Sequence, residues 1–161
     1  MKASNFLRKL KNEGKLGLIE PTEEVARSYE HKSRDCLLSA KLLLKEQLFE
    51  NATGEAYYAM YNSVTSLLFT FGIKCENHSA SAILLKKLLK LEKIYRTFSK
   101  SKEERIDKQY YVTPLQTTPA TKESVQIFIR TAETFILEIN NIKNKLQLET
   151  IKNIRKNFES M

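Results

Sequence analysis

The sequence is poor in the residues that build turns and all-β folds. Its 161 residues include four glycines, three prolines and no tryptophan, whereas short strands joined by tight turns need glycine, proline or asparagine at many positions. Hydrophobic residues make up 42% of the chain and charged residues 29%. This balance favours long amphipathic helices around one core, because the chain is too short for two domains of ordinary size.

Long apolar runs and a cysteine framework are also missing. The most hydrophobic stretch, residues 64–73, is about half the length needed to span a bilayer, and the first residues lack a signal-peptide core. Cys36 and Cys75 are too few for a disulfide scaffold and have no further ligand at zinc-site spacing. We therefore expect a cytoplasmic protein without membrane contact, metal or cofactor.

Positive charge is in excess. The formal net charge is +8, and between residues 86 and 108 nine lysines and arginines face four acidic residues. A basic surface favours polyanions, because each neutralised phosphate releases counterions. The same pattern also fits a solvated helix face or contact with an acidic protein.

Hydrophobic periodicity predicts the elements. Apolar residues at three-and-four spacing indicate a short helix over 4–15 and long helices over 21–49, 51–71, 78–98 and 122–148. Gly72 is expected as a left-handed cap. Residues 99–121 are predicted as a long, partly ordered loop, because Pro114 and Pro119 interrupt any helix there.

The predicted fold class is all-α: an antiparallel up-down four-helix bundle with a short extra N-terminal helix. Residues 1–20 would form the short helix and a linker, and residues 21–148 the bundle. Residues 149–161 are predicted as a basic C-terminal extension whose end frays.

Three motifs stand in a specific order along this bundle. They are Ala56-Tyr57-Tyr58-Ala59-Met60-Tyr61-Asn62, then Gly72 and His78, then Arg105-Ile106-Asp107-Lys108-Gln109-Tyr110-Tyr111. In order and spacing the chain resembles the HEPN superfamily, in particular its small stand-alone prokaryotic members. The resemblance implies a helical bundle that is often dimeric. Many members are metal-independent ribonucleases of toxin-antitoxin or defence systems, and many are encoded beside a minimal nucleotidyltransferase that acts as antitoxin.

The chain departs from the motif of the nuclease members, which is an arginine, four to six intervening residues and a histidine. After Arg105, the matching positions hold Tyr110 and Tyr111, and Arg27 precedes His31 by only three intervening residues. An ordinary tyrosine has a pKa near 10 and is a poor general base at neutral pH. The sequence therefore argues against efficient RNA cleavage by this motif.

We accordingly expect a binding and interaction module, homodimeric and paired with a nucleotidyltransferase-type protein. The candidate residues for binding RNA or a nucleotide are Lys102, Arg105, Lys108, Tyr110 and Tyr111. One alternative is a divergent endoribonuclease whose catalytic candidates are Arg105, Tyr110, Tyr111 and His78. Another is a nucleotide-binding accessory subunit, and a structural reading makes Arg105 a solvated charge.

The remaining candidates have structural readings of their own. His78 is expected to cap a helix or lie on the surface, because it stands where a helix begins. Tyr57 and Tyr61 share one helix face and Tyr58 lies about 100° away. We predict the three tyrosines to be core or dimer-interface aromatics.

Overall fold

The computed structural model describes residues 3–110 and 119–161, with side chains up to residue 106 and from residue 119. The described elements are α1 (Ala3–Asn12), β1 (Leu16–Leu18), α2 (Glu23–Lys45), α3 (Phe49–Thr70), β2 (Ile73–Cys75), α4 (His78–Lys87), α5 (Glu92–Tyr110), α6 (Lys122–Asn144) and α7 (Leu148–Glu159). The prediction of a mostly helical chain is confirmed. None of the described helices is both long and apolar enough to cross a membrane.

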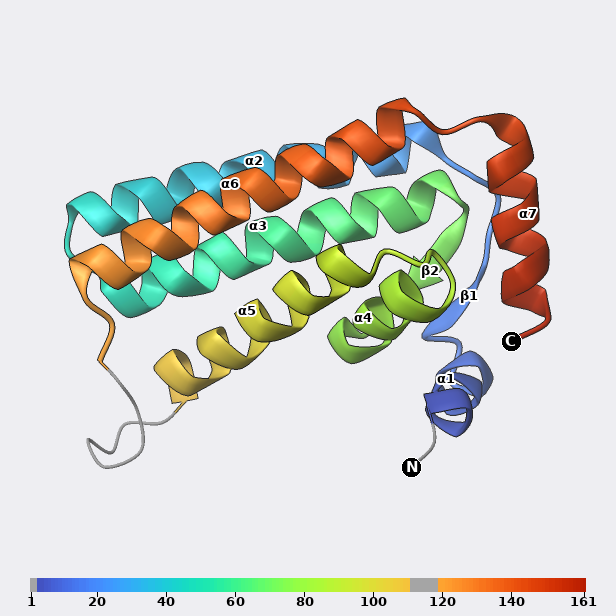
Figure 1. Cartoon of the computed structure of the whole chain (residues 1–161), viewed down its shortest axis with the longest axis horizontal. Helices are drawn as coiled ribbons and strands as arrows, with labels where there is room; N and C mark the ends of the chain where they lie inside the picture. Colours follow the sequence, from blue (N-terminus) through green and yellow to red (C-terminus); the bar gives the residue numbers. More distant parts are fainter. Residues whose placement is uncertain (1–2, 111–118) are drawn as a thin grey trace.

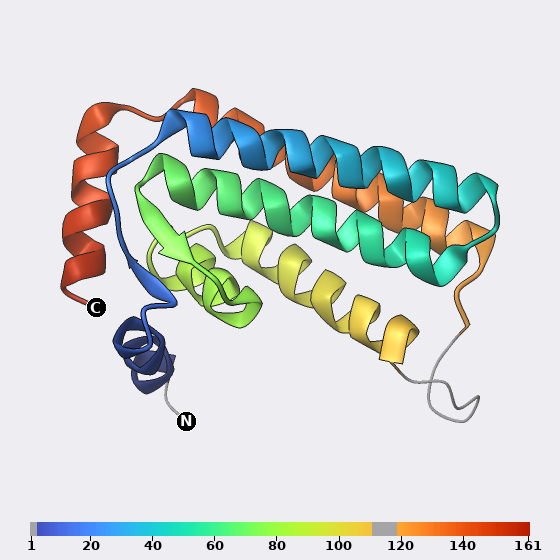
Figure 2. The same cartoon turned by 180° about the vertical axis from the view of Figure 1, so that it is seen from behind.

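The long helices α2, α3, α5 and α6 lie side by side and run in alternating directions (Figures 1 and 2). Helix α3 is central and packs against the other three. Its Ala52, Ala56 and Ala59 are fully buried, and such small residues let neighbouring helices approach closely. Met60 and Val64 extend the same buried surface, so α3 forms the middle of the core.

The predicted helix over 78–98 is interrupted, and the predicted loop after it is partly helical. Helix α4 ends at Lys87 and α5 begins at Glu92, with Lys90 between them at a φ of 58°. The unbroken apolar spacing through this segment hides the break. Helix α5 continues to Tyr110, because a proline forbids helix only near its own position. The loop prediction for 111–118 lies outside the described residues.

A small antiparallel sheet joins the N-terminal segment to the end of α3. Strand β1 pairs with β2 in the register Leu16↔Cys75, Gly17↔Lys74 and Leu18↔Ile73. Neither strand was predicted, since three residues are too few to show the alternation of a strand. Gly72 has a φ of 68° just after α3, so its predicted role as a left-handed cap is confirmed.

The C-terminal residues differ from the predicted extension. Helix α6 ends at Asn144, and α7 packs across the end of the long helices near β1 (Figure 1). Phe158 is only 3% exposed, and Arg155 Nη1 donates hydrogen bonds to Ile19 O at 2.8 Å and Phe71 O at 2.9 Å. The prediction of a fraying tail was wrong because the anchoring residues are few among many polar ones.

Candidate functional site

Helices α3, α4 and α5 bring six of the predicted site residues together. We call them the Arg105 cluster: Tyr57, Tyr58, Tyr61, His78, Lys102 and Arg105. On α3 the tyrosines follow the spacing of one helical turn, and on α5 the two cations are three residues apart and share a face. Asn77 caps α4 by accepting a hydrogen bond from Ala80 N at 2.9 Å. The cap places His78 at the first helical position.

The imidazole of His78 is enclosed by the three tyrosines of α3. The Tyr57 hydroxyl lies 2.7 Å from His78 Nδ1. The Tyr61 ring stacks on the imidazole with centroids 3.7 Å apart and planes 6° from parallel. Tyr58 meets it edge-on at 6.2 Å and 77°. These contacts fix both the position and the plane of the imidazole.

Two cations of α5 lie beside this aromatic group. Arg105 Cζ lies 5.2 Å from the Tyr57 ring centroid and 5.6 Å from that of Tyr58. These distances are typical of cation–π contacts. Arg105 Nη1 also donates to the Tyr58 hydroxyl at 3.4 Å, and Lys102 Nζ donates to Ser79 Oγ at 2.6 Å.

Burial and these cations set the protonation of the cluster. Burial, and after it the positive charges of Arg105 and Lys102, lower the pKa of His78 to about 4. Burial raises the pKa of Tyr57, and it raises the pKa of Tyr61 to about 12. At neutral pH the imidazole and both phenols are therefore uncharged. The cluster thus combines neutral hydrogen-bonding groups with two positive charges, which suits an anion.

The structure separates the roles predicted for Tyr57 and Tyr58. Tyr57 is 0% exposed and stacks on Phe98 at 5.7 Å, so it belongs to the core of this chain. Tyr58 is 37% exposed, and its role at an interface stays a prediction. The contact between Tyr57 and His78 was missed, because His78 was expected to cap the helix that Asn77 caps.

The structure does not describe the side chains of three other predicted site residues, Lys108, Tyr110 and Tyr111. The backbone of α5 includes Lys108 and Tyr110, but their side chains and the whole of Tyr111 lie outside the described residues. Their binding and catalytic roles stay predictions. In the described part of the chain, no three histidine, cysteine or acidic side chains are grouped to hold a metal ion.

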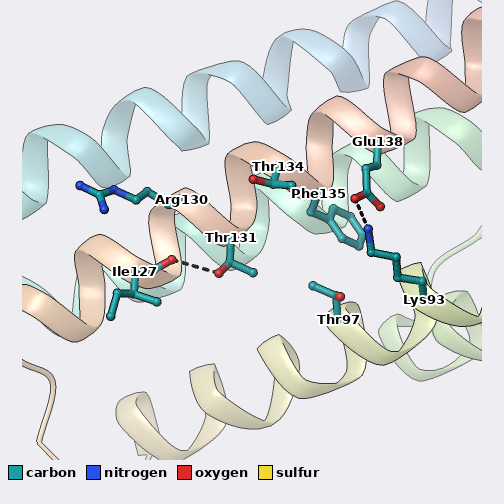
Figure 3. A pocket seen from close by; sticks show the side chains of 8 residues that line it. All are labelled: Lys93, Thr97, Ile127, Arg130, Thr131, Thr134, Phe135 and Glu138. Atoms are coloured by element: carbon teal, nitrogen blue, oxygen red, sulfur yellow. Dashed lines mark hydrogen bonds and ion pairs between the residues drawn. The ribbon is translucent and has the colours of Figure 1, made fainter.

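A separate groove of about 420 Å³ lies between α5 and α6 (Figure 3). Lys93 Nζ crosses it to Glu138 Oε1 at 2.5 Å, and Ile127 is 64% exposed beside it. In Figure 3 the Arg130 guanidinium points away from Thr97. The Lys93 side chain at this groove is therefore already paired with a carboxylate.

The fold and the cluster define a helical domain with an aromatic, cationic site. The chain belongs to the HEPN domain family, whose pattern it matches over residues 26–142. The resemblance drawn from the three sequence motifs is thus confirmed. The chain is also 26% identical over 126 residues to a UPF0332 protein of Thermotoga maritima, a similarity that covers 78% of this chain and 96% of that protein.

Proposed function

We propose that this chain is an RNA-binding HEPN domain that holds an RNA phosphate at the Arg105 cluster without efficient cleavage. The observation that carries this proposal is that Arg105 lies against Tyr57 and the exposed Tyr58, while Lys102 binds Ser79, the neighbour of His78. Guanidinium groups bind phosphate through paired hydrogen bonds, and an exposed tyrosine ring offers a surface on which a base stacks. The net charge of +8 adds a general attraction for polyanions.

The same geometry argues for binding over turnover. A general base works best when its pKa is close to the working pH. The imidazole of His78 has a pKa of about 4, so it is a weak base at neutral pH. At that pH it is also not protonated to the imidazolium that would act as a general acid. The phenol of Tyr57 is also unsuited as a general base, because burial raises its pKa and so keeps it protonated at neutral pH. Neither group supports efficient proton transfer from the RNA 2′-hydroxyl.

Retention of a mixed-sequence single-stranded RNA on a native gel, in EDTA, tests this function. We expect a shift with the wild-type protein that is lost or weakened at least about tenfold in Arg105→Ala, with the RNA intact. Arg96→Ala is the matched control. Arg96 lies on the same helix, is 76% exposed and pairs with Glu92 at 3.1 Å. Nine residues from Arg105, it points to the opposite side of α5.

Other outcomes would replace the proposal. RNA cleavage in EDTA that Arg105→Ala abolishes would make the chain a divergent ribonuclease that uses the cluster. A shift that is equal in both variants would remove the cluster as the RNA site. Calorimetric heat with ATP in the absence of RNA binding would favour a nucleotide-binding accessory subunit.

We further propose that α2, α3, α5 and α6 act as the four-helix bundle of a homodimer that pairs with a minimal nucleotidyltransferase in a toxin-antitoxin or defence-type system. Membership of the HEPN family supports this proposal. Light scattering of the purified chain should give twice its 18.7 kDa mass. Co-expression with a nucleotidyltransferase encoded beside it should yield a complex of fixed stoichiometry. A monomeric chain would contradict the homodimer, and a chain that does not co-purify with the nucleotidyltransferase would contradict the pairing.

A further inference from the structure

We infer that Tyr57 is a positioning residue whose phenolic O–H donates to His78 Nδ1 and so holds the imidazole as the neutral tautomer with its hydrogen on Nε2. The Nε2–H group is then an uncharged hydrogen-bond donor for a bound phosphate, beside Lys102 and Arg105. The donor role rests on the proposed RNA-binding function. The positioning role of Tyr57 is a property of the free protein.

The direction of the hydrogen bond follows from the burial of Tyr57. Its side chain is 0% exposed, so water does not reach the hydroxyl, and a buried O–H that donates to nothing is costly. Among the described residues the one acceptor within hydrogen-bond distance is His78 Nδ1 at 2.7 Å. Nδ1 must then be unprotonated, and a neutral imidazole with a bare Nδ1 carries its hydrogen on Nε2.

Packing holds both partners of this bond in place. The Tyr57 ring stacks on Phe98, which is itself 0% exposed, with centroids 5.7 Å apart and planes 15° from parallel. The imidazole is held by the stacked Tyr61 ring at 3.7 Å. Neither ring can turn without losing these contacts, so the hydroxyl and Nδ1 stay opposed.

The charges around His78 oppose a second proton on the ring. Helix α3 presents the phenols of Tyr57 and Tyr61, which are neutral at physiological pH, and the ring of Tyr58. Helix α5 presents the cations Lys102 and Arg105. On the segment that leads into α4, Glu76 pairs with Lys74 at 2.8 Å. Protonation of Nδ1 would also force the Tyr57 hydroxyl to become an acceptor and leave its own hydrogen without a described acceptor. The neutral tautomer is therefore favoured by both the hydrogen bond and the cations.

Nitrogen-15 NMR of the histidine side chains tests the positioning role in the free protein. The chain has only two histidines, His31 and His78, and the exposed His31 serves as the internal reference. We expect His78 to show a bare Nδ1 and a protonated Nε2 from pH 5.5 to 8. In Tyr57→Phe the tautomers should mix and the pKa of His78 should rise, because the hydrogen bond that favours the neutral ring is gone.

Tyr61→Phe is the matched control, since it keeps the stacked ring and leaves the bond between Tyr57 and His78 intact. A protonated Nδ1 in the wild-type protein would overturn the inference, and so would a Tyr57→Phe spectrum identical to the wild type. The wild-type spectrum decides the direction of the bond even if Tyr57→Phe does not fold.

Adding the mixed-sequence single-stranded RNA to the labelled wild-type protein tests the donor role. We expect the Nε2 and Nε2–H resonances of His78 to shift while those of His31 stay in place. RNA that binds in an Arg105-dependent manner without moving the His78 resonances would overturn the donor role alone. RNA that does not bind would end the proposed function and the donor role, while the free-protein spectra would still decide the role of Tyr57.

Discussion

Tyr61 and His78 stack face to face, with ring centroids 3.7 Å apart and planes only 6° from parallel. The tyrosine ring covers one face of the imidazole and removes it from water. Desolvation disfavours a charged group, so this contact contributes to the burial that, together with the charges of Arg105 and Lys102, lowers the pKa of His78 to about 4. The stacked pair therefore links the local packing of α3 and α4 to the charge of the site.

The depressed pKa of His78 predicts that the protein loses stability in mild acid. The unfolded chain takes up a proton on this histidine near pH 6.5, whereas the folded chain does so only near pH 4. Between these values the unfolded state binds more protons, so the unfolding free energy falls as the pH drops from 6.5 to 4 and is fully retained above 6.5. Because His78 is only half-buried, solvent screening reduces the expected loss to about 1–2 kcal/mol.

Urea denaturation at pH 7 and pH 4.5 measures this loss. His78→Gln should lose less stability between the two values than the wild-type protein, because a glutamine does not titrate. His31→Gln is the control and should behave like the wild type, since His31 is exposed. Equal acid sensitivity of wild type and His78→Gln would show that other groups cause it.

Lys102 is predicted to contribute one phosphate contact to RNA binding. Lys102→Ala should reduce the slope of log Kd against log salt concentration by about 0.7, the value for one phosphate on a single strand. Retention of RNA at a series of potassium chloride concentrations measures the slope. Lys93→Ala is the control, because Lys93 lies nine residues away on the opposite side of α5 and pairs with Glu138. An unchanged slope in Lys102→Ala would remove Lys102 from the phosphate site.

The helical class, the long helices and the members of the Arg105 cluster could be predicted from the sequence. Apolar spacing identifies α2, α3 and α6 because each buries a stripe many turns long. The motif order singled out Tyr57, His78 and Arg105, although it assigned them to separate roles.

The missed features depend on contacts between distant segments. Strands β1 and β2 are three residues long and exist because residues 16–18 and 73–75 meet in space. The bond between Tyr57 and His78 joins positions 21 residues apart on different helices. Lys90, after α4, has a left-handed backbone conformation, which the presence of a lysine at this position does not predict. No local spacing carries such information.

Arg155 is predicted to anchor α7 and the linker before α2 to the end of α3. Its Nη1 donates to Ile19 O and Phe71 O, which come from two separate segments. Arg155→Ala should lower the unfolding free energy by about 2 kcal/mol or more, because partly buried carbonyls lose a charged donor. Lys152→Ala, an exposed cation on the same helix, is the control and should change stability by less than about 0.5 kcal/mol. Equal, small effects in urea denaturation would show that Arg155 does not hold α7 in place.

Gly72 and Gly14 offer a comparison that separates backbone strain from crowding. Both have a left-handed backbone, with φ of 68° and 69°, and alanine in that conformation costs about 1–2 kcal/mol. A Cβ on Gly72 would also lie 2.4 Å from Ile19 O and 2.1 Å from Arg155 Nη1, whereas a Cβ on Gly14 meets nothing within 4 Å. Gly72→Ala should therefore lose about 1–3 kcal/mol more than Gly14→Ala.

Urea denaturation of the two alanine variants measures this difference, and a third variant locates its source. Combining Gly72→Ala with Arg155→Ala removes the flexible side chain that the new methyl group would strike, but leaves the carbonyl of Ile19 in place. The loss of stability in the double variant should therefore be smaller than the sum of the losses in Gly72→Ala and Arg155→Ala. The contact with the Ile19 carbonyl should still destabilise the double variant. Equal losses in Gly72→Ala and Gly14→Ala would show that the turn after α3 yields to the methyl group. The junction of α3, β1 and α7 would then be looser than its hydrogen bonds indicate.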